Sequence, residues 1–123
     1  APRRERVIAA PTAALMTEMM QGVVERGTGV RAKIDRPAAG KTGTTSDYSD
    51  GWFIGYTPEL LAGVWIGNDE SNRPMKTAEG YLGSGMAASL WGAFMTRALS
   101  GLPTSSFVHA DRRNQALDAE IYP

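Results

Sequence analysis

The chain lacks cysteine, and histidine occurs once, at His109. Without cysteine there is no disulfide and no thiolate nucleophile, a composition that suits an oxidising compartment without requiring one. One histidine cannot form a histidine cluster around a metal. We also predict no metal ligands and no cofactor. No apolar stretch approaches the roughly 20 residues of a membrane span, and the N-terminal APRRERVIAAP has no signal-peptide core. We therefore expect any membrane anchor to lie outside this chain.

The charged side chains balance in sign. The 123 residues carry 13 basic and 13 acidic side chains, and 42% of them are hydrophobic. Beyond Arg3, Arg4 and Arg6 no basic residues cluster, so the composition gives no reason to expect nucleic-acid binding. Length and composition indicate one modest globular domain.

Hydrophobic periodicity predicts a helix near residues 11–26. Its apolar positions follow the i, i+3, i+4, i+7, i+8 spacing of an amphipathic helix, and we expect them to be core: Met16, Met19, Met20, Val23 and Val24. Pro11 suits the first turn. Gly27 is expected to end the helix in a left-handed cap.

Three strands are predicted next. Residues 37–45 form a strand of small residues, and GWFIGYT and LLAGVWIG form an antiparallel hairpin turning at Pro58. Small residues from Ala38 to Gly43 mark the first strand as the possible edge of a groove, because glycine in a strand often signals a close approach.

A polar loop, residues 68–83, is predicted to precede a second helix that Ser84 caps. One face of that helix carries Leu90, Trp91, Phe94, Met95 and Ala98, and Gly101 with Pro103 ends it. The tail from Thr104 is expected to run over the surface or fray. The predicted fold is α+β: helix, three-stranded antiparallel sheet, helix.

The stretch GKTGTT, residues 40–45, allows several interpretations. A nucleotide-binding loop needs a glycine five residues before Gly40, where the chain has Asp35, and no amphipathic helix follows Thr45. A solvated turn also suits glycine and threonine. Taken alone, these residues do not decide between the alternatives.

The wider sequence resembles the penicillin-binding transpeptidases, specifically the C-terminal part of the transpeptidase domain of class A, bifunctional members. The likeness runs from about Val7 to Pro103, through LMTEMMQGVVERGTG, RPAAGKTGTT, DGWFIGYTPELLAGVWIGND and LWGAFMTRAL. It assigns residues 1–103 to this domain and 104–123 to a C-terminal tail. It implies a serine β-lactamase-like fold and an enzyme that cross-links peptidoglycan.

The resemblance also implies roles for the GKTGTT residues. Lys41 would line the cleft opposite the serine of the family's second motif, Ser-x-Asn, and Thr44 would offer its backbone N–H to the oxyanion. The substrate-binding residues would be Thr42, Gly43, Thr44 and Thr45, with Thr42 and Thr44 on the substrate carboxylate. The implied partners are D-Ala-D-Ala stem peptides, β-lactams and the remainder of the domain.

The nucleophile of this family has no match in the chain. No serine is followed three residues later by lysine, and none begins Ser-x-Asn. The stretch Leu82–Gly85 also departs from the family's Thr-Gly-Gly. A Ser-His-Asp triad built on His109 with Ser105 or Ser106 is a local coincidence in a polar tail.

Three functional classes therefore remain at the level of sequence. The favoured one is an inactive fragment of a periplasmic or envelope transpeptidase, anchored through a segment outside the chain. The alternatives are a non-catalytic peptidoglycan-binding or scaffold module and a β-lactamase relative. The near-continuous apolar runs WFI and VWI predict strands covered on both faces in the intact domain, and we expect two helices alone to leave part of these faces uncovered. We therefore expect the isolated chain to self-associate.

Overall fold

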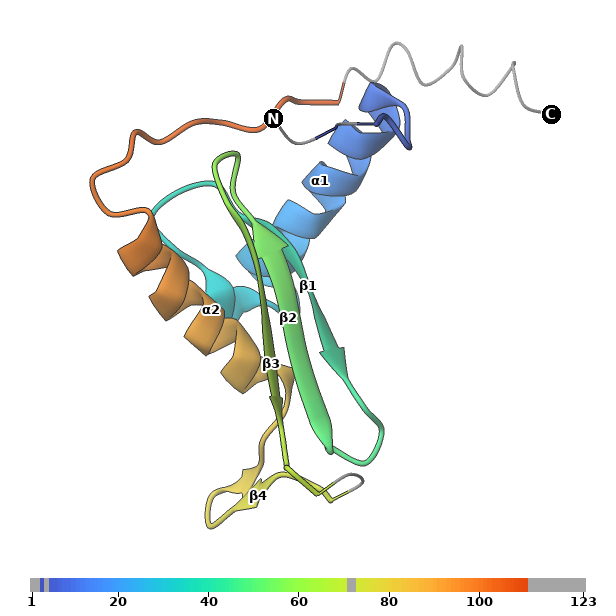
Figure 1. Ribbon diagram of the computed structural model, residues 1–123, viewed down its shortest axis with the longest axis vertical. Helices are drawn as coiled ribbons and strands as arrows, with labels where there is room; N and C mark the ends of the chain where they lie inside the picture. Colours follow the sequence, from blue (N-terminus) through green and yellow to red (C-terminus); the bar gives the residue numbers. More distant parts are fainter. Residues whose placement is uncertain (1–2, 4, 71–72, 111–123) are drawn as a thin grey trace, which may run out of the picture.

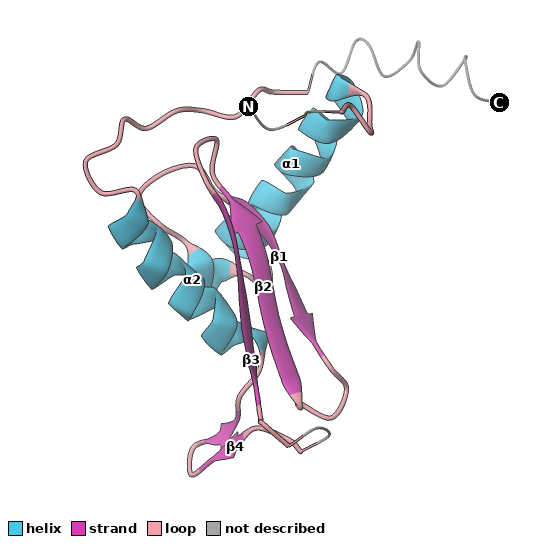
Figure 2. Cartoon of the chain, viewed as in Figure 1, coloured by secondary structure: helices cyan, strands magenta, loops and turns pink. Residues whose placement is uncertain are grey.

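The structure is a computed structural model that describes residues 3, 5–70 and 73–110 (Figures 1 and 2). Its elements in chain order are α1 (Ala10–Arg26), η1 (Val30–Ala32), β1 (Ala39–Thr44), β2 (Asp50–Tyr56), β3 (Leu61–Gly67), β4 (Lys76–Thr77), β5 (Gly80–Tyr81) and α2 (Ser84–Ala98). Two helices with a small antiparallel sheet confirm the predicted α+β class. Within the described part of the chain, no helix is both long and apolar enough to cross a bilayer.

The main sheet has the order β1-β2-β3, so β1 and β3 are its two edges. The predicted hairpin between β2 and β3 is confirmed: the Thr57 N–H donates to the Leu60 carbonyl at 2.9 Å, and the Thr57 hydroxyl accepts from the Glu59 N–H at 3.2 Å. In Figure 1, α2 lies along one side of this sheet.

Helix α1 begins and ends close to the predicted positions, with Pro11 in its first turn. Its predicted core is largely wrong, because only Val24 of the five residues is fully buried, while Met16 and Met19 are exposed. Val24, near the C-terminus of α1, packs into the core, whereas Met16 and Met19 near its middle do not. Gly27 ends the helix with φ −104°, so the predicted left-handed cap is also wrong.

Helix α2 buries a different stripe from the one predicted. Trp91 and Met95 are completely buried, as expected, whereas Leu90 and Phe94 are about half exposed. Small residues complete the buried stripe at Ala87 and Ala88. The prediction chose the face with the largest apolar side chains. The buried face is offset from it by about one position, because periodicity alone does not show that alanines face the sheet. Gly101, with φ +78°, follows the helix as predicted.

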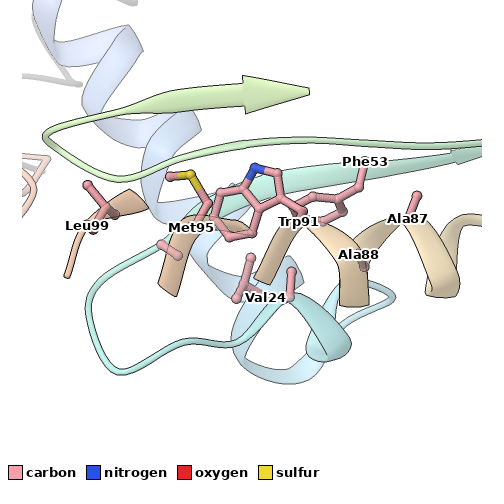
Figure 3. Close-up of a cluster of buried hydrophobic side chains, with 9 residues drawn as sticks. Val24, Phe53, Ala87, Ala88, Trp91, Met95 and Leu99 are labelled. Atoms are coloured by element: carbon pink, nitrogen blue, oxygen red, sulfur yellow. The ribbon is translucent and has the colours of Figure 1, made fainter. Parts of the chain in front are cut away.

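The core lies between α2, the C-terminal half of α1 and one face of the sheet (Figure 3). The Trp91 indole packs edge-on against Phe53 with ring centroids 5.2 Å apart, and its Nε1–H donates to the Ala62 carbonyl at 3.0 Å. Gly55 makes room for both rings, because a Cβ there would lie 2.6 Å from Phe53 and 2.9 Å from Trp91. This core anchors β2, the central strand, which pairs with the edge strand β1.

The predicted loop 68–83 contains a short ribbon, β4 paired with β5, that the sequence analysis missed. Two-residue strands leave too little alternation to detect. The tail runs over the surface as far as it is described: the Ser105 N–H donates to Glu59, and Phe107 packs edge-on against Tyr56. The rest of the predicted tail, residues 111–123, lies outside the described residues.

Candidate active-site edge

Strand β1 presents one row of backbone groups that its neighbour does not use. The Thr45 N–H donates to the Asp50 carbonyl, which fixes the hydrogen-bonded pairs of the β1–β2 ladder. Because such pairs alternate along antiparallel strands, the N–H and C=O groups of Gly40, Thr42 and Thr44 point away from β2. An extended peptide could pair with this edge as an additional strand.

The side chains of β1 alternate across the sheet. The register places Thr42 opposite Phe53 and Thr44 opposite Gly51, on the face that the helices cover. Lys41 lies opposite Ile54, on the other face. The GKTGTT residues therefore surround the free edge of β1 from both sides of the sheet.

Lys41 is exposed, and its ammonium bends round the strand edge. Its Nζ donates to the Thr42 carbonyl at 3.0 Å and lies 3.5 Å from the Thr42 hydroxyl. No ion pair involves Lys41 in the part of the chain that the structure describes, unlike Lys33, which pairs with Glu25. The Lys41 ammonium therefore places positive charge at the edge, where a bound anion would meet it.

Thr28 was missed as a residue of this edge. Its hydroxyl lies 2.7 Å from the Thr42 hydroxyl, so the loop after α1 is tied directly to β1. The only signal in the sequence was the stretch ERGTG, which does not reveal its partner. One of the two hydroxyls donates to the other, and the acceptor keeps its own proton for a further partner.

The Thr44 side chain joins β1 to the start of α2. Its Oγ1 accepts from the Ser84 N–H at 3.1 Å, and the N-cap residue is Gly83, with no side-chain cap. The predicted Ser84 cap is therefore wrong, because Thr44 supplies the oxygen from a distant strand. Since Oγ1 accepts from an N–H, the Thr44 hydroxyl proton can still donate to an anion. The N-terminus of α2 adds partial positive charge nearby.

The Thr45 hydroxyl belongs to the turn that follows β1. It accepts from the Asp50 N–H at 3.0 Å and lies 3.1 Å from the Ser49 hydroxyl. Hydrogen bonds from the Ser49 hydroxyl and backbone N–H, and from Thr45, hold the pKa of Asp47 below its ordinary value. This turn is thus ordered by its own polar groups, and the substrate-binding role of Thr45 stays a prediction.

The small residues of β1 divide into two groups. Ala38, Ala39 and Gly40 are buried, and a Cβ at Gly40 would lie 2.6 Å from Phe53. They serve the core. Gly43 differs, because a Cβ there would meet only Trp52, at an ordinary 3.4 Å. Only Gly43 leaves the strand open on the face that carries Lys41.

Two tyrosines flank the end of β1 and were also missed. Tyr48 stacks on Tyr81 with ring centroids 5.2 Å apart, joining the β1–β2 turn to the β4–β5 ribbon. Tyr48 has φ +59°, the only positive φ among the non-glycine residues that the structure describes. The strain is held by this packing and by the Met75 N–H, which donates to the Tyr48 carbonyl.

The edge has groups that can bind and polarise an anionic ligand. It brings together the Lys41 ammonium group with the hydroxyl groups and the outward backbone N–H groups of Thr42 and Thr44. Among the described residues, no group of three metal-ligating side chains is found. The arrangement suits an extended, carboxylate-bearing ligand.

The chain is similar in sequence to known proteins. The family described as "Penicillin binding protein transpeptidase domain" matches residues 1–82. Penicillin-binding protein 1A of Pseudomonas aeruginosa is 43% identical over 101 residues, which cover 80% of this chain and 12% of that protein. Penicillin-binding protein 1A of Aquifex aeolicus is 36% identical over 107 residues, 86% of this chain and 14% of that protein.

Solved structures show the same relationship. PonA1, a penicillin-binding protein from Mycobacterium tuberculosis, superposes with a TM-score of 0.75 at 30% identity, over 82% of this chain and 28% of that one. Its complex with penicillin V gives a TM-score of 0.74 at 30% identity and covers 29% of that chain. The present chain thus spans only a small part of these relatives. It belongs to the penicillin-binding protein transpeptidase domain family.

Proposed function

We propose that this chain supplies the K-T-G strand of a serine-type peptidoglycan DD-transpeptidase, an envelope enzyme that β-lactams inhibit. The observation that carries the proposal is the free edge of β1, where Lys41 and the outward groups of Thr42 and Thr44 converge. Family membership and the penicillin V complex of PonA1 support it. The catalytic serine and its base would come from the preceding part of the domain.

The proposed reaction has two acyl transfers. The serine hydroxyl attacks the carbonyl between the two D-Ala residues of a stem peptide, and the terminal D-Ala leaves as its amine takes up a proton. An acceptor amine then attacks the ester and releases the serine. In both steps the Thr44 N–H would stabilise the oxyanion, while Lys41 would stabilise the polar network beside the serine.

Substrate would bind along the edge of β1. Backbone pairing to Thr42 and Thr44 would hold the peptide extended, and Gly43 would leave room beside the strand. The donor carboxylate would accept from the hydroxyls of Thr42 and Thr44. The Lys41 ammonium would leave the Thr42 carbonyl as substrate takes its place.

The first prediction tests the division of the active site. Residues 1–123 alone should form no covalent adduct with a fluorescent penicillin, because no serine here has the lysine partner of the family. The full-length protein should form a stoichiometric adduct that survives denaturing electrophoresis. A stable adduct on a serine of the isolated chain would contradict the proposal, and no adduct on the full-length protein would favour a non-catalytic binding module.

The second prediction concerns the Thr44 hydroxyl. In the full-length protein, Thr44→Val keeps the backbone N–H but removes the hydroxyl, so carboxylate-bearing β-lactams should lose about 1–3 kcal/mol of binding free energy. Affinity is read from the concentration dependence of acylation. Thr44→Ser is the matched control, because it restores both the donor and the acceptor for the Ser84 N–H. Equal weakening of a ligand that lacks the carboxylate would show that the hydroxyl does not bind it.

A further inference from the structure

Thr28 lies between two glycines in the loop that follows α1, and the backbone fixes its position. The N–H groups of Gly27 and Gly29 both donate to the Val23 carbonyl, at 3.1 and 3.0 Å. Both glycines permit a close approach: an added Cβ would lie 2.9 Å from the Val23 Cα at Gly27, and 3.1 Å from the Phe53 and Val23 side chains at Gly29. These contacts hold the loop independently of the Thr28 side chain.

The Thr28 hydroxyl faces the edge of β1. Among the described residues its one hydrogen-bond partner is the Thr42 hydroxyl, 2.7 Å away, and the pair is exposed. A hydrogen bond between two exposed hydroxyls adds little to the stability of the fold, because water can replace either partner. The main effect of the contact is therefore on the Thr42 hydroxyl itself.

Proton counting fixes the direction of this hydrogen bond once a carboxylate is bound. A carboxylate only accepts, so the Thr42 hydroxyl binds it by pointing its own proton at the ligand. The Thr42 oxygen can then only accept from its protein neighbours. The Lys41 ammonium, 3.5 Å from this oxygen, is a donor in any case, so Thr28 must donate to Thr42 as well. Hydrogen bonds that run in one direction along a chain strengthen one another.

We propose that Thr28 is a positioning residue for the ligand carboxylate: by donating to the Thr42 Oγ1, it directs the Thr42 proton to the ligand. The proposal rests on the proposed function for the presence of a carboxylate at Thr42. Without the Thr28 hydroxyl, the Thr42 hydroxyl loses the donor that polarises it and is free to point its proton elsewhere. The loss should therefore fall on ligands that carry a carboxylate.

The test uses the full-length protein and two ligands, a penicillin and the methyl ester of the same penicillin. Thr28→Val removes the hydroxyl at nearly constant shape, and Thr28→Ser, which keeps the hydroxyl, is the matched control. Thr28→Ala removes the hydroxyl with a smaller side chain, so a loss common to both hydroxyl-free variants belongs to the hydroxyl. The second-order rate constant for acylation is measured by mass spectrometry of the intact adduct, and Thr28→Val is repeated in a Thr42→Val background.

We expect Thr28→Val and Thr28→Ala to slow acylation by the penicillin about 3- to 10-fold, the range for one hydrogen bond. Both variants should slow acylation by the methyl ester much less, and Thr28→Ser should retain the penicillin rate. In the Thr42→Val background, Thr28→Val should add no further loss, because a residue that acts through Thr42 then has no hydroxyl to position.

Three results would overturn this role. Equal slowing with the penicillin and its ester would make Thr28 a structural residue. A Thr28→Ser variant as slow as Thr28→Val would show that the hydroxyl is not what matters. An undiminished effect of Thr28→Val in the Thr42→Val background would show that Thr28 does not act through Thr42.

The same measurements separate this proposal from the proposed function. Normal acylation of both the unsubstituted protein and Thr28→Val would leave the function standing and overturn the positioning role. No acylation of the unsubstituted protein by either ligand would overturn the proposed function, and with it the ligand that Thr28 is proposed to position.

Discussion

Lys41→Ala in the full-length protein is expected to slow acylation by penicillin about 100-fold or more, comparable to the loss of one oxyanion donor in other acyl-transfer enzymes. Among the described residues, the Lys41 ammonium donates only to the Thr42 carbonyl and hydroxyl, so its charge is available to a bound anion. Water that enters the space left by the side chain cannot replace a fixed charge beside the reacting atoms. The measurement is the second-order rate constant for acylation by a fluorescent penicillin.

Two matched variants serve as controls for this prediction. Lys33→Ala removes an exposed lysine that pairs with Glu25 at the surface, and should change acylation little. Lys41→Arg keeps the charge but changes its reach and hydrogen-bonding geometry, so it should recover only part of the rate. An acylation rate for Lys41→Ala equal to that of Lys33→Ala would remove Lys41 from the active site.

The sequence was sufficient for the elements whose signals are local. The hairpin was found because aromatic and β-branched residues flank Pro58, and α1 because its apolar spacing is regular. Burial depends on partners that the sequence does not display. Met16 and Met19 lie on the predicted stripe of α1, yet they are 44% and 60% exposed among the described residues. The same holds for Trp52 and Trp65, each about half exposed on one face of the sheet.

The candidate site likewise combines features that the sequence predicts with features that only the tertiary structure shows. The residues of GKTGTT could be selected from their type and from the family resemblance, and the strand period correctly put Thr42 and Thr44 on one face. Their partners could not be predicted, since Thr28 and Ser84 reach β1 only through the packing of α1 and α2. Long-range contacts of this kind are set by tertiary structure rather than by local pattern.

Trp91→Ala is expected to lower the free energy of unfolding of residues 1–123 by about 3–5 kcal/mol, the usual cost of removing a large buried aromatic side chain. Trp91 is completely buried, packs against Phe53 and donates to the Ala62 carbonyl, which the variant would leave with one partner fewer. Gly55, which faces Trp91, has no side chain to fill part of the space. A small domain is stable by only about 5–15 kcal/mol, so much of its stability would be lost. Urea titration at one fixed protein concentration measures the change.

Trp65→Ala provides the matched control for this loss. Trp65 is 49% exposed on the sheet face that also carries Trp52 and Ile54, where it lies beside Trp52 and donates from Nε1 to Asp50 at 2.7 Å. Its removal costs a cross-strand pair and an exposed hydrogen bond, about 1 kcal/mol together. Equal destabilisation by the two substitutions would mean that the sheet face carrying Trp52, Ile54 and Trp65 is already buried in the isolated chain. The core between α2 and the sheet would then not be the main source of stability for β1. A much larger loss for Trp91→Ala than for Trp65→Ala would show that the Trp91 core stabilises the sheet that carries the candidate active-site edge.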